Sequence, residues 1–198
     1  MKFVLATQNP KKLKEMSAIL GELGVEVVSE ADLGVKIEVE ETGTTFAENA
    51  TLKAKAICAA SGLPAIADDS GLCVDALNGG PGVYSARFGG EGLDDTGRYR
   101  LLLQMMHGQA DRRAHFHTTI TCAFPNGDVL QDDGEVEGTI AFAPMGENGF
   151  GYDPVFFVPD KRKTFAQLSA EEKAEISHRG KALRAFKETL KNYLAEHQ

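Results

Sequence analysis

The sequence predicts an α/β protein with a mixed β-sheet flanked by helices. Strand-like and helix-like segments alternate in the first third of the chain, which is typical of α/β folds. Later, residues 115–124 and 129–141 alternate like strands around Asn126-Gly127, a strong hairpin signal. An antiparallel pair favours a mixed sheet over a purely parallel one. With 198 residues, the chain suits one sizeable domain or two small lobes sharing a sheet.

The first half of the chain contains helices with clear start and stop signals. Asn9 is a candidate N-cap with Pro10 at the first helical position, and Gly24 ends that helix. The pair Thr45-x-x-Glu48 forms a capping box for a second helix, which we expect to reach about Ala60. Strands are expected at residues 2–6, 25–29 and 65–67.

The second half is richer in glycine. We expect loops at 79–92 and 146–153, a helix at 96–106 and an apolar strand at 155–158. Ser169-x-x-Glu172 predicts a short capped helix, and Ser177 is a candidate cap for a longer helix that follows.

Composition and charge exclude several classes of protein. The net charge of −8 argues against broad nucleic-acid binding, so we expect no nucleic-acid partner. No apolar stretch is long enough for a membrane span, and the opening residues lack a signal-peptide pattern. Three widely spaced cysteines, Cys58, Cys73 and Cys122, indicate a reducing compartment. We therefore expect a cytoplasmic protein without a membrane partner.

The stretch ATQNPKK is the first candidate site. A strand, a short polar turn and a helix N-terminus form a natural anion site, because the helix presents free N–H groups and the positive end of its dipole. Lys11 and Lys12 lie in that first turn, where a bound phosphate would offset their repulsion from the dipole. The alternative is a solvated lysine pair. The spacing is not that of a P-loop.

Lys53 is the second candidate. On the predicted helix it falls within the apolar arc, whereas Lys55 points the opposite way. A lysine on a buried face needs a partner or a cleft, although it could also extend outward past its neighbours. Upstream, Glu40 and Glu41 would face opposite sides if they lay in a strand, so at most one would point into a shared site. A solvated acidic loop is the alternative.

The sequence ADDSG is the third candidate. Asp68 and Asp69 follow an apolar strand, and Gly71 would allow a sharp turn. Strand ends of α/β sheets commonly hold ligands, and paired carboxylates favour hard cations such as Mg²⁺ beside phosphate. The alternative is an Asx-type turn. If the strand continues through both residues, only one carboxylate faces the site.

Two motifs near the C-terminus form the fourth candidate. The segment ENGFGYDPVFF places Phe150, Tyr152 and Asp153 on a glycine-rich loop, where an aromatic ring and a carboxylate suit a purine base. The segment EEKAEISHRG adds three basic residues. These are Lys173, His178 and Arg179.

His115 and His117 form an H-x-H pair on one strand face. Zinc binding is conceivable, but no third ligand is apparent, and we expect surface histidines.

Taken together and in order, these segments resemble the inosine triphosphate pyrophosphatase family, whose members remove deaminated purine nucleotides. The matching pieces are LATQNPKKLKE, EETGTTFAENATLKA, LPAIADDSGLCVDALNGGPGVYSARF, GFGYDPVFFVP and EEKAEISHRGKAL. Gln8 stands where the family usually has glycine. The resemblance implies an elongated mixed sheet, two lobes with the active site in the cleft between them, and a homodimer.

The resemblance also implies roles for individual residues. Lys12 and Lys53 would contact the triphosphate. Glu41 and Asp69 would hold Mg²⁺ or the water, with Asp69 as general base. We expect Asp68 to be either a metal ligand or a carboxylate that supports the ligands. The implied substrate-binding residues are Thr7, Gln8, Asn9, Lys12, Lys53, Ser70, Phe150, Gly151, Tyr152, Asp153, Lys173, His178 and Arg179.

The expected reaction is hydrolysis of ITP, dITP or XTP to the monophosphate and pyrophosphate. A water would attack the α-phosphorus, with Lys12 and Lys53 stabilising the departing pyrophosphate. Donors such as Arg179 or His178 would recognise the 6-oxo group and reject adenine. Two alternatives remain open: a pyrophosphatase for pyrimidine triphosphates and a nucleotide-binding regulatory protein without turnover. A two-metal nuclease fits less well, because the chain lacks a basic stripe.

Overall fold

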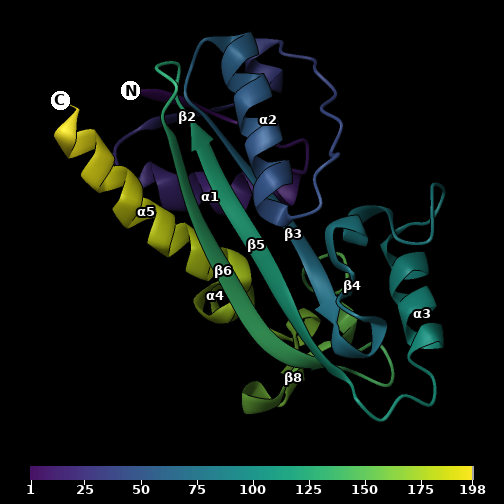
Figure 1. Ribbon diagram of the computed structural model, residues 1–198. Coiled ribbons are helices and arrows are strands. Elements are labelled where there is room, and N and C mark those ends of the chain that lie inside the picture. The colour runs from purple at the N-terminus through teal and green to yellow at the C-terminus, as the bar shows by residue number, and fades with distance from the viewer. Residues whose placement is uncertain (198) are drawn as a thin grey trace. The chain divides into compact units, whose positions relative to one another are not determined.

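The computed structural model describes residues 1–197 (Figure 1). The sheet has eight strands in the order β2-β1-β3-β5-β6-β7-β8, with β4 paired to β3. The strands are β1 Lys2–Leu5, β2 Glu26–Ser29, β3 Ala65–Val74, β4 Gly80–Pro81, β5 Arg113–Ala123, β6 Val129–Ile140, β7 Phe156–Val158 and β8 Lys163–Thr164. The α-helices are α1 Pro10–Gly21, α2 Phe46–Ser61, α3 Asp95–Met105, α4 Ala170–Ile176 and α5 His178–Glu196.

The sheet is mixed, as the sequence predicts. Strand β1 pairs in parallel with β2 and β3, with Leu5 opposite Ser29 on one side and Ile66 on the other. The β3–β4, β6–β7 and β7–β8 pairs are antiparallel. Among the described residues, no helix combines the length and the apolar character that crossing a membrane requires.

The chain divides into two compact units. Unit 1 comprises Met1–Asp69, Thr118–Gly134 and the chain from Ala182 onward. Unit 2 comprises Ser70–His117 and Glu135–Lys181. The boundaries fall within β3, β5, β6 and α5.

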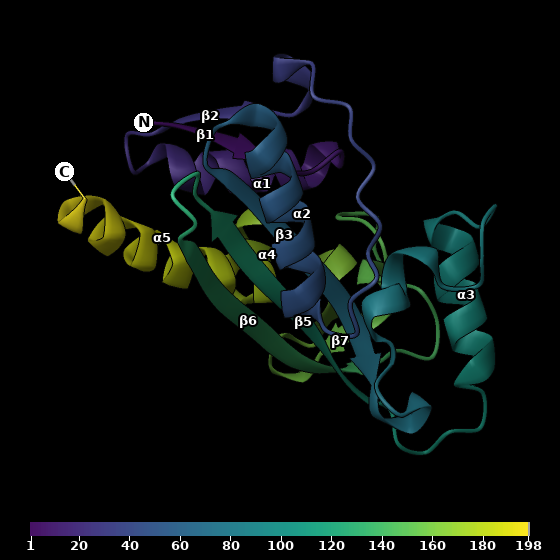
Figure 2. The same ribbon diagram turned by 45° about the horizontal axis from the view of Figure 1, so that its top comes forward.

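The side chains of β1 alternate between the two faces of the sheet, and helices of unit 1 cover both faces. Phe3 and Leu5 pack in one apolar cluster with residues of α1 and α5. Val4 and Ala6 pack in a second cluster with residues of α2. Figure 2 shows α1 and α2 on opposite sides of the intervening strands. The N-terminus of α1 and one face of α2 therefore approach the same strands from opposite sides.

The predicted helix starts are confirmed. The Asn9 side chain accepts hydrogen bonds from the N–H groups of Lys11 and Lys12, with Pro10 next in the chain. Thr45 accepts from the N–H of Glu48 at the start of α2, and Gly62 ends that helix in a left-handed conformation, with φ of 69°. Ser169 forms the capping box of α4 with Glu172.

The expectation of a short strand at 65–67 followed by a turn is wrong. Strand β3 continues to Val74, so Asp68 and Asp69 lie in its middle. The polar residues resemble a turn in the sequence, but charged partners on both faces allow the strand to continue. The apolar residues after Gly71, beginning with Leu72, resume the buried pattern.

The expected loop at 79–92 also contains regular structure. Gly80–Pro81 forms β4, and a 3₁₀-helix spans Gly82–Arg87. Ser85 explains part of this order, because its hydroxyl accepts a hydrogen bond from the N–H of Leu72 and donates to the carbonyl of Gly82. Leu72 belongs to the main apolar cluster of unit 2, which also contains residues of α3, β5, β6 and β7.

Candidate active site

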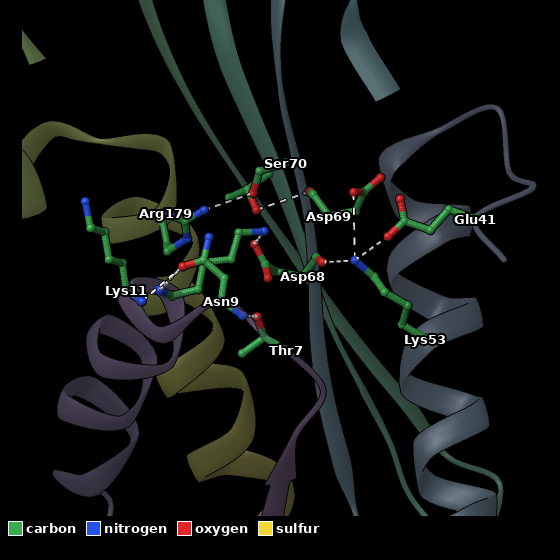
Figure 3. A network of polar contacts seen from close by, with 11 residues as sticks. Thr7, Asn9, Lys11, Glu41, Lys53, Asp68, Asp69, Ser70 and Arg179 are labelled. Atoms are coloured by element: carbon green, nitrogen blue, oxygen red, sulfur yellow. Dashed lines mark hydrogen bonds and ion pairs between the residues drawn. The ribbon is translucent and has the colours of Figure 1, made fainter. Parts of the chain in front are cut away.

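Lys53 is the centre of a polar network in unit 1. Its Nζ lies 3.0 Å from Oε1 of Glu41, donates a 2.6 Å hydrogen bond to the carbonyl oxygen of Asp68 and lies 3.9 Å from Oδ1 of Asp69 (Figure 3). Only 18% of the Lys53 side chain is exposed. Lys53, which helical spacing places on the buried face of α2, therefore has the polar partners that a buried lysine needs.

The two neighbouring aspartates point to opposite faces of β3. Oδ2 of Asp68 lies 3.0 Å from Nζ of Lys12, at the start of α1, whereas Asp69 faces Lys53. This is the alternation expected of a strand. Asp68 is 2% exposed on its side chain, and Lys12 supplies the charge that its burial requires. The structure thus separates Asp68 from Glu41 and Asp69.

Asp69 is the least compensated carboxylate of the network. Burial raises its pKa from the ordinary 3.8 to about 6, although the Lys53 ammonium opposes that rise. Its Oδ2 is buried and accepts no hydrogen bond from any residue between 1 and 197. Its backbone is held in place, since Thr118 Oγ1 donates to the Asp69 carbonyl oxygen at 3.3 Å. A buried carboxylate oxygen in this environment can bind a cation or a water molecule.

The segment that carries Glu41 is irregular, so Glu40 and Glu41 do not alternate as they would in a strand. The sequence predicts that at most one of Glu40 and Glu41 points into a shared site. In the structure, Glu41 contacts Lys53. Gly43 donates its N–H to Oδ1 of Asn49 at 2.8 Å, and Thr44 N–H donates to Glu48. These bonds tie the Glu41 segment to the first turn of α2.

Sequence reasoning missed two polar residues near Lys53. Glu30 follows β2, is buried, and has a raised pKa because of that burial, which the Lys53 charge opposes. Its position at the end of a strand-like segment does not indicate that it lies near Lys53. Asn49 is fully buried on α2. It could have been found, because it precedes Lys53 by one helical turn and so shares its face.

The carboxylates around Lys53 are chemically suited to Mg²⁺. Within residues 1–197, no three or more His, Cys, Asp or Glu side chains are grouped so that they could hold a metal on their own. Mg²⁺ does not need such a cage, because it commonly takes one or two carboxylates and completes its shell with water and phosphate. Glu41 and Asp69, with the buried Oδ2, fit that pattern. Asp68 fits it poorly, since Lys12 occupies its carboxylate.

The turn before α1 is built from the predicted phosphate-binding residues. Asn9 N–H donates to Thr7 Oγ1 at 3.2 Å, and Asn9 Oδ1 caps the helix. Gln8 is exposed between them, and Lys12 reaches Asp68. The structure therefore places Lys12 beside β3, whereas Lys11 is exposed.

In unit 2, the predicted loop is organised around a buried ion pair. Asp153 Oδ2 lies 2.7 Å from Nζ of Lys173 on α4 and accepts the Phe150 N–H at 3.1 Å. Burial raises the pKa of Asp153, while Lys173 and the Phe150 N–H favour its charged form. The ammonium of Lys173 lies 4.7 Å from the centre of the Phe150 ring. Asp153 and Lys173 thus set the shape of the loop that presents Phe150.

Other residues of this loop have distinct environments. Tyr152 is buried in the core of unit 2 and donates its hydroxyl to the Ser85 carbonyl at 2.6 Å. Gly151 has a φ of 60° and donates its N–H to Asp95 at 2.9 Å. Of the two aromatic residues on this loop, Phe150 and Tyr152, only Phe150 is partly exposed.

His178 and Arg179 begin α5, whose first turn is capped by Ser177 as expected. The His178 ring stacks on Phe116, with 4.7 Å between the ring centres. Arg179 donates to Ser70 Oγ at 3.4 Å, and its guanidinium lies 5.6 Å from the Phe150 ring centre. Ser70, Phe150 and Arg179 are thus brought together within unit 2.

His115 and His117 both approach Glu135 on the neighbouring strand. Glu135 Oε2 lies 3.3 Å from Nδ1 of His117 and 4.0 Å from Nε2 of His115. This trio lies outside the two groups of predicted site residues.

Comparison with known proteins agrees with these observations. The sequence is 52% identical to a dITP/XTP pyrophosphatase from an Exiguobacterium species, over 93% of this chain and 94% of that protein. It is 51% identical to a dITP/XTP pyrophosphatase from Thermus thermophilus, over 97% of this chain and 93% of that protein.

A solved structure has the same fold. The Ham1 protein of Staphylococcus aureus matches with a TM-score of 0.90 and 42% identity, over 98% of this chain and 100% of that one. A family model described as the Ham1 family matches residues 3–189. The chain therefore belongs to the Ham1 family.

Proposed function

We propose that this protein hydrolyses deaminated purine nucleoside triphosphates, namely dITP, XTP and ITP, to the monophosphate and pyrophosphate. One observation carries the proposal: Asp69 lies beside Lys53, which also contacts Glu41, and its buried Oδ2 has no hydrogen-bond partner within residues 1–197. Relatives that are about half identical over nearly the full chain and are named dITP/XTP pyrophosphatases support the substrate class. The protein would thereby remove damaged nucleotides from the pool.

Glu41 and Asp69 would hold Mg²⁺ together with the substrate phosphates. The chemistry supplied by bound Mg²⁺ is neutralisation of the phosphate charge and alignment of the phosphate oxygens. Asp68 keeps Lys12 in place through their 3.0 Å ion pair, so it positions a cation rather than a metal.

The remaining steps belong to side chains of this chain. Asp69 orients or deprotonates the water that attacks the α-phosphorus, a task suited to a carboxylate whose pKa is raised to about 6. Lys53 and Lys12 stabilise the charge on the departing pyrophosphate. Thr7, Gln8 and Asn9, in the turn before α1, would contact phosphate oxygens at the positive end of the helix dipole.

Unit 2 would recognise the nucleoside. Phe150 offers a ring for base stacking, and Lys173 and Asp153 hold its loop. A donor at Arg179, His178 or a nearby N–H would bond the 6-oxo group, while Ser70 contacts the substrate beside Arg179. Adenine carries an amino group there, and a donor left unpaired costs several orders of magnitude in specificity. In this proposal Gly151 and Tyr152 shape the same loop.

The organisation of the active protein is also proposed. The chain would act as a single nucleoside-triphosphate pyrophosphatase domain, in a cytoplasmic homodimer. The thiols of Cys58, Cys73 and Cys122 are free, which suits a reducing compartment.

A substrate panel tests the function. The protein is incubated with Mg²⁺ and ITP, XTP, dITP, GTP, ATP or dTTP, and monophosphate and pyrophosphate are quantified. The proposal expects pyrophosphate from the deaminated purines and little from ATP or dTTP. A preference for dTTP would favour a pyrimidine triphosphatase, and tight ITP binding without product would favour a regulatory binding protein. Either result would contradict the proposal.

A further inference from the structure

Asn49 is placed to link the two segments that carry the carboxylates of unit 1. It lies on α2 one helical turn before Lys53, so the two side chains share a face. Its Oδ1 accepts the Gly43 N–H at 2.8 Å, which holds the segment that carries Glu41. The side chain is fully buried, with 0% exposure.

The other end of the same amide influences Asp69, which lies on β3. Its Nδ2 is buried and donates no hydrogen bond to any residue between 1 and 197, and Oδ2 of Asp69 accepts none within that range. The amide nevertheless lies near enough to Asp69 to favour its charged form. A buried donor and a buried acceptor without partners are costly, and a small movement or one bridging water would satisfy both.

Gly43 is fitted closely to this contact. A Cβ at position 43 would lie 2.6 Å from Cβ of Glu48 and 2.7 Å from Oδ1 of Asn49. A side chain there would push the Glu41 segment away from α2. The tight packing of Gly43 against α2 and its hydrogen bond to Asn49 therefore both hold the Glu41 segment in one position.

The contact to Gly43 matters most when Lys53 changes partner. Lys53 now holds both segments through its contacts with Glu41 and with the Asp68 carbonyl. If Lys53 turns toward a phosphate, as the proposed function requires, these contacts weaken. The bond from Gly43 to Asn49 involves neither the charge of Lys53 nor the carboxylate of Glu41, so it can persist in the loaded enzyme.

We propose that Asn49 is a positioning residue, which fixes the Glu41 segment through Gly43 and orients the Asp69 carboxylate through Nδ2. This inference rests on the proposed function for its catalytic consequence. Residues that orient ligands of a metal site in this way typically change activity by roughly 10- to 100-fold when replaced. The uncharged amide suits the role, since it adds no charge to a site where carboxylates already outnumber lysines.

Two substitutions distinguish the role of the amide oxygen from the role of the amide nitrogen. Asn49→Asp keeps an acceptor for the Gly43 N–H and removes the donor toward Asp69, whereas Asn49→Leu removes both and carries no charge. We expect both variants to lose roughly 10- to 100-fold in kcat on dITP with little change in KM. The loss in Asn49→Leu cannot come from an added charge, because leucine carries none.

The matched control is Asn126 in the β5–β6 hairpin. Its Oδ1 accepts the Asp128 N–H at 2.9 Å and its Nδ2 donates to the Asp128 carboxylate at 2.8 Å, which is the same pair of roles on an exposed turn. Asn126→Asp is expected to keep kcat and KM within about twofold of the wild type. Normal kcat in both Asn49 variants would overturn the proposal, and normal kcat in Asn49→Asp alone would overturn the orienting role toward Asp69.

A second readout does not depend on turnover. Hydrogen exchange of the Gly43 amide should be fast in Asn49→Leu and protected in the wild type and in Asn49→Asp. Unchanged protection in Asn49→Leu would contradict the link to Gly43. If the wild type releases no pyrophosphate, the proposed function fails, whereas Gly43 exchange still decides whether Asn49 holds the segment. If Asn49→Leu does not fold, Asn49→Asp decides the orienting role.

Discussion

Asp69 lies beside Lys53 without a close ion pair, with 3.9 Å between Asp69 Oδ1 and Lys53 Nζ. The lysine instead makes its short contacts with Glu41 and the Asp68 carbonyl. Asp69 therefore stays incompletely neutralised, and burial raises its pKa to about 6. A carboxylate in this environment is suited to bind a cation and to accept a proton from water.

Replacing Asp69 by asparagine should remove turnover and leave the fold intact. Asparagine has nearly the same shape, but it cannot accept a proton from water and it lacks the negative charge with which a carboxylate binds a metal ion. We expect kcat on dITP to fall by roughly 10²- to 10⁴-fold, measured by pyrophosphate release. Circular dichroism checks the fold, and near-normal activity would remove Asp69 from the mechanism.

The same substitution should stabilise the metal-free protein at neutral pH. Because the folded-state pKa of Asp69 is raised from 3.8 to about 6, its contribution to stability is fully present below pH 3.8 and is lost as the pH rises through about 6. The asparagine side chain does not titrate in this range. In EDTA at pH 7.5, thermal unfolding of Asp69→Asn should show a gain of up to about 3 kcal/mol over the wild type.

The comparison with low pH tests this reasoning. Near pH 4 the wild-type Asp69 is protonated in the folded state, so the two proteins should differ little. A stability difference that stays constant from pH 4 to pH 7.5 would contradict the raised pKa.

Replacing Lys53 by methionine should impair both stability and catalysis. Methionine keeps the apolar stem but leaves Glu41, Asp69 and the Asp68 carbonyl without their cation. Loss of one partner of a largely buried charge network costs about 3 kcal/mol in unfolding free energy, which denaturant titration measures. Lys55→Met on the exposed side of the same helix is the control and should change neither property. Equal behaviour of the two variants would contradict the central place of Lys53.

The sequence predicted much of this network for physical reasons. Lys53 stands out because helical spacing places a charge within an apolar arc, and the structure supplies its partners. Asn9 and Thr45 stand out because helix caps have local signatures. The course of β3 could not be predicted, because the partner of Asp68 is Lys12, more than fifty residues away in the chain. Glu30 was missed for the same reason, since Lys53, whose charge acts on it, lies more than twenty residues away in the chain.

The Asp153–Lys173 pair gives a further prediction. Lys173→Met would leave the buried Asp153 carboxylate without its cation, at a cost of about 3 kcal/mol in unfolding free energy. The double variant Asp153→Asn/Lys173→Met should recover part of that loss, because no buried charge remains. Chemical denaturation measures both, with the exposed Lys161→Met as control. Additive losses in the double variant would show that the two residues act independently.

Here too the sequence indicated the residues but not their arrangement. The sequence predicts Phe150, Tyr152 and Asp153 as contacts for a base. The structure directs Asp153 toward Lys173 and buries Tyr152 in the core of unit 2, because a glycine-rich loop needs internal partners to hold one shape. Such partners lie on α4, and the spacing of the motifs does not reveal the pairing.

The most direct test of the account is the position of the new oxygen after hydrolysis. The protein is incubated with Mg²⁺ and dITP in ¹⁸O-enriched water, and the products are analysed by mass spectrometry. Attack at the α-phosphorus predicts one ¹⁸O atom in dIMP and unlabelled pyrophosphate. Label in the pyrophosphate, or release of orthophosphate from dITP, would contradict the account.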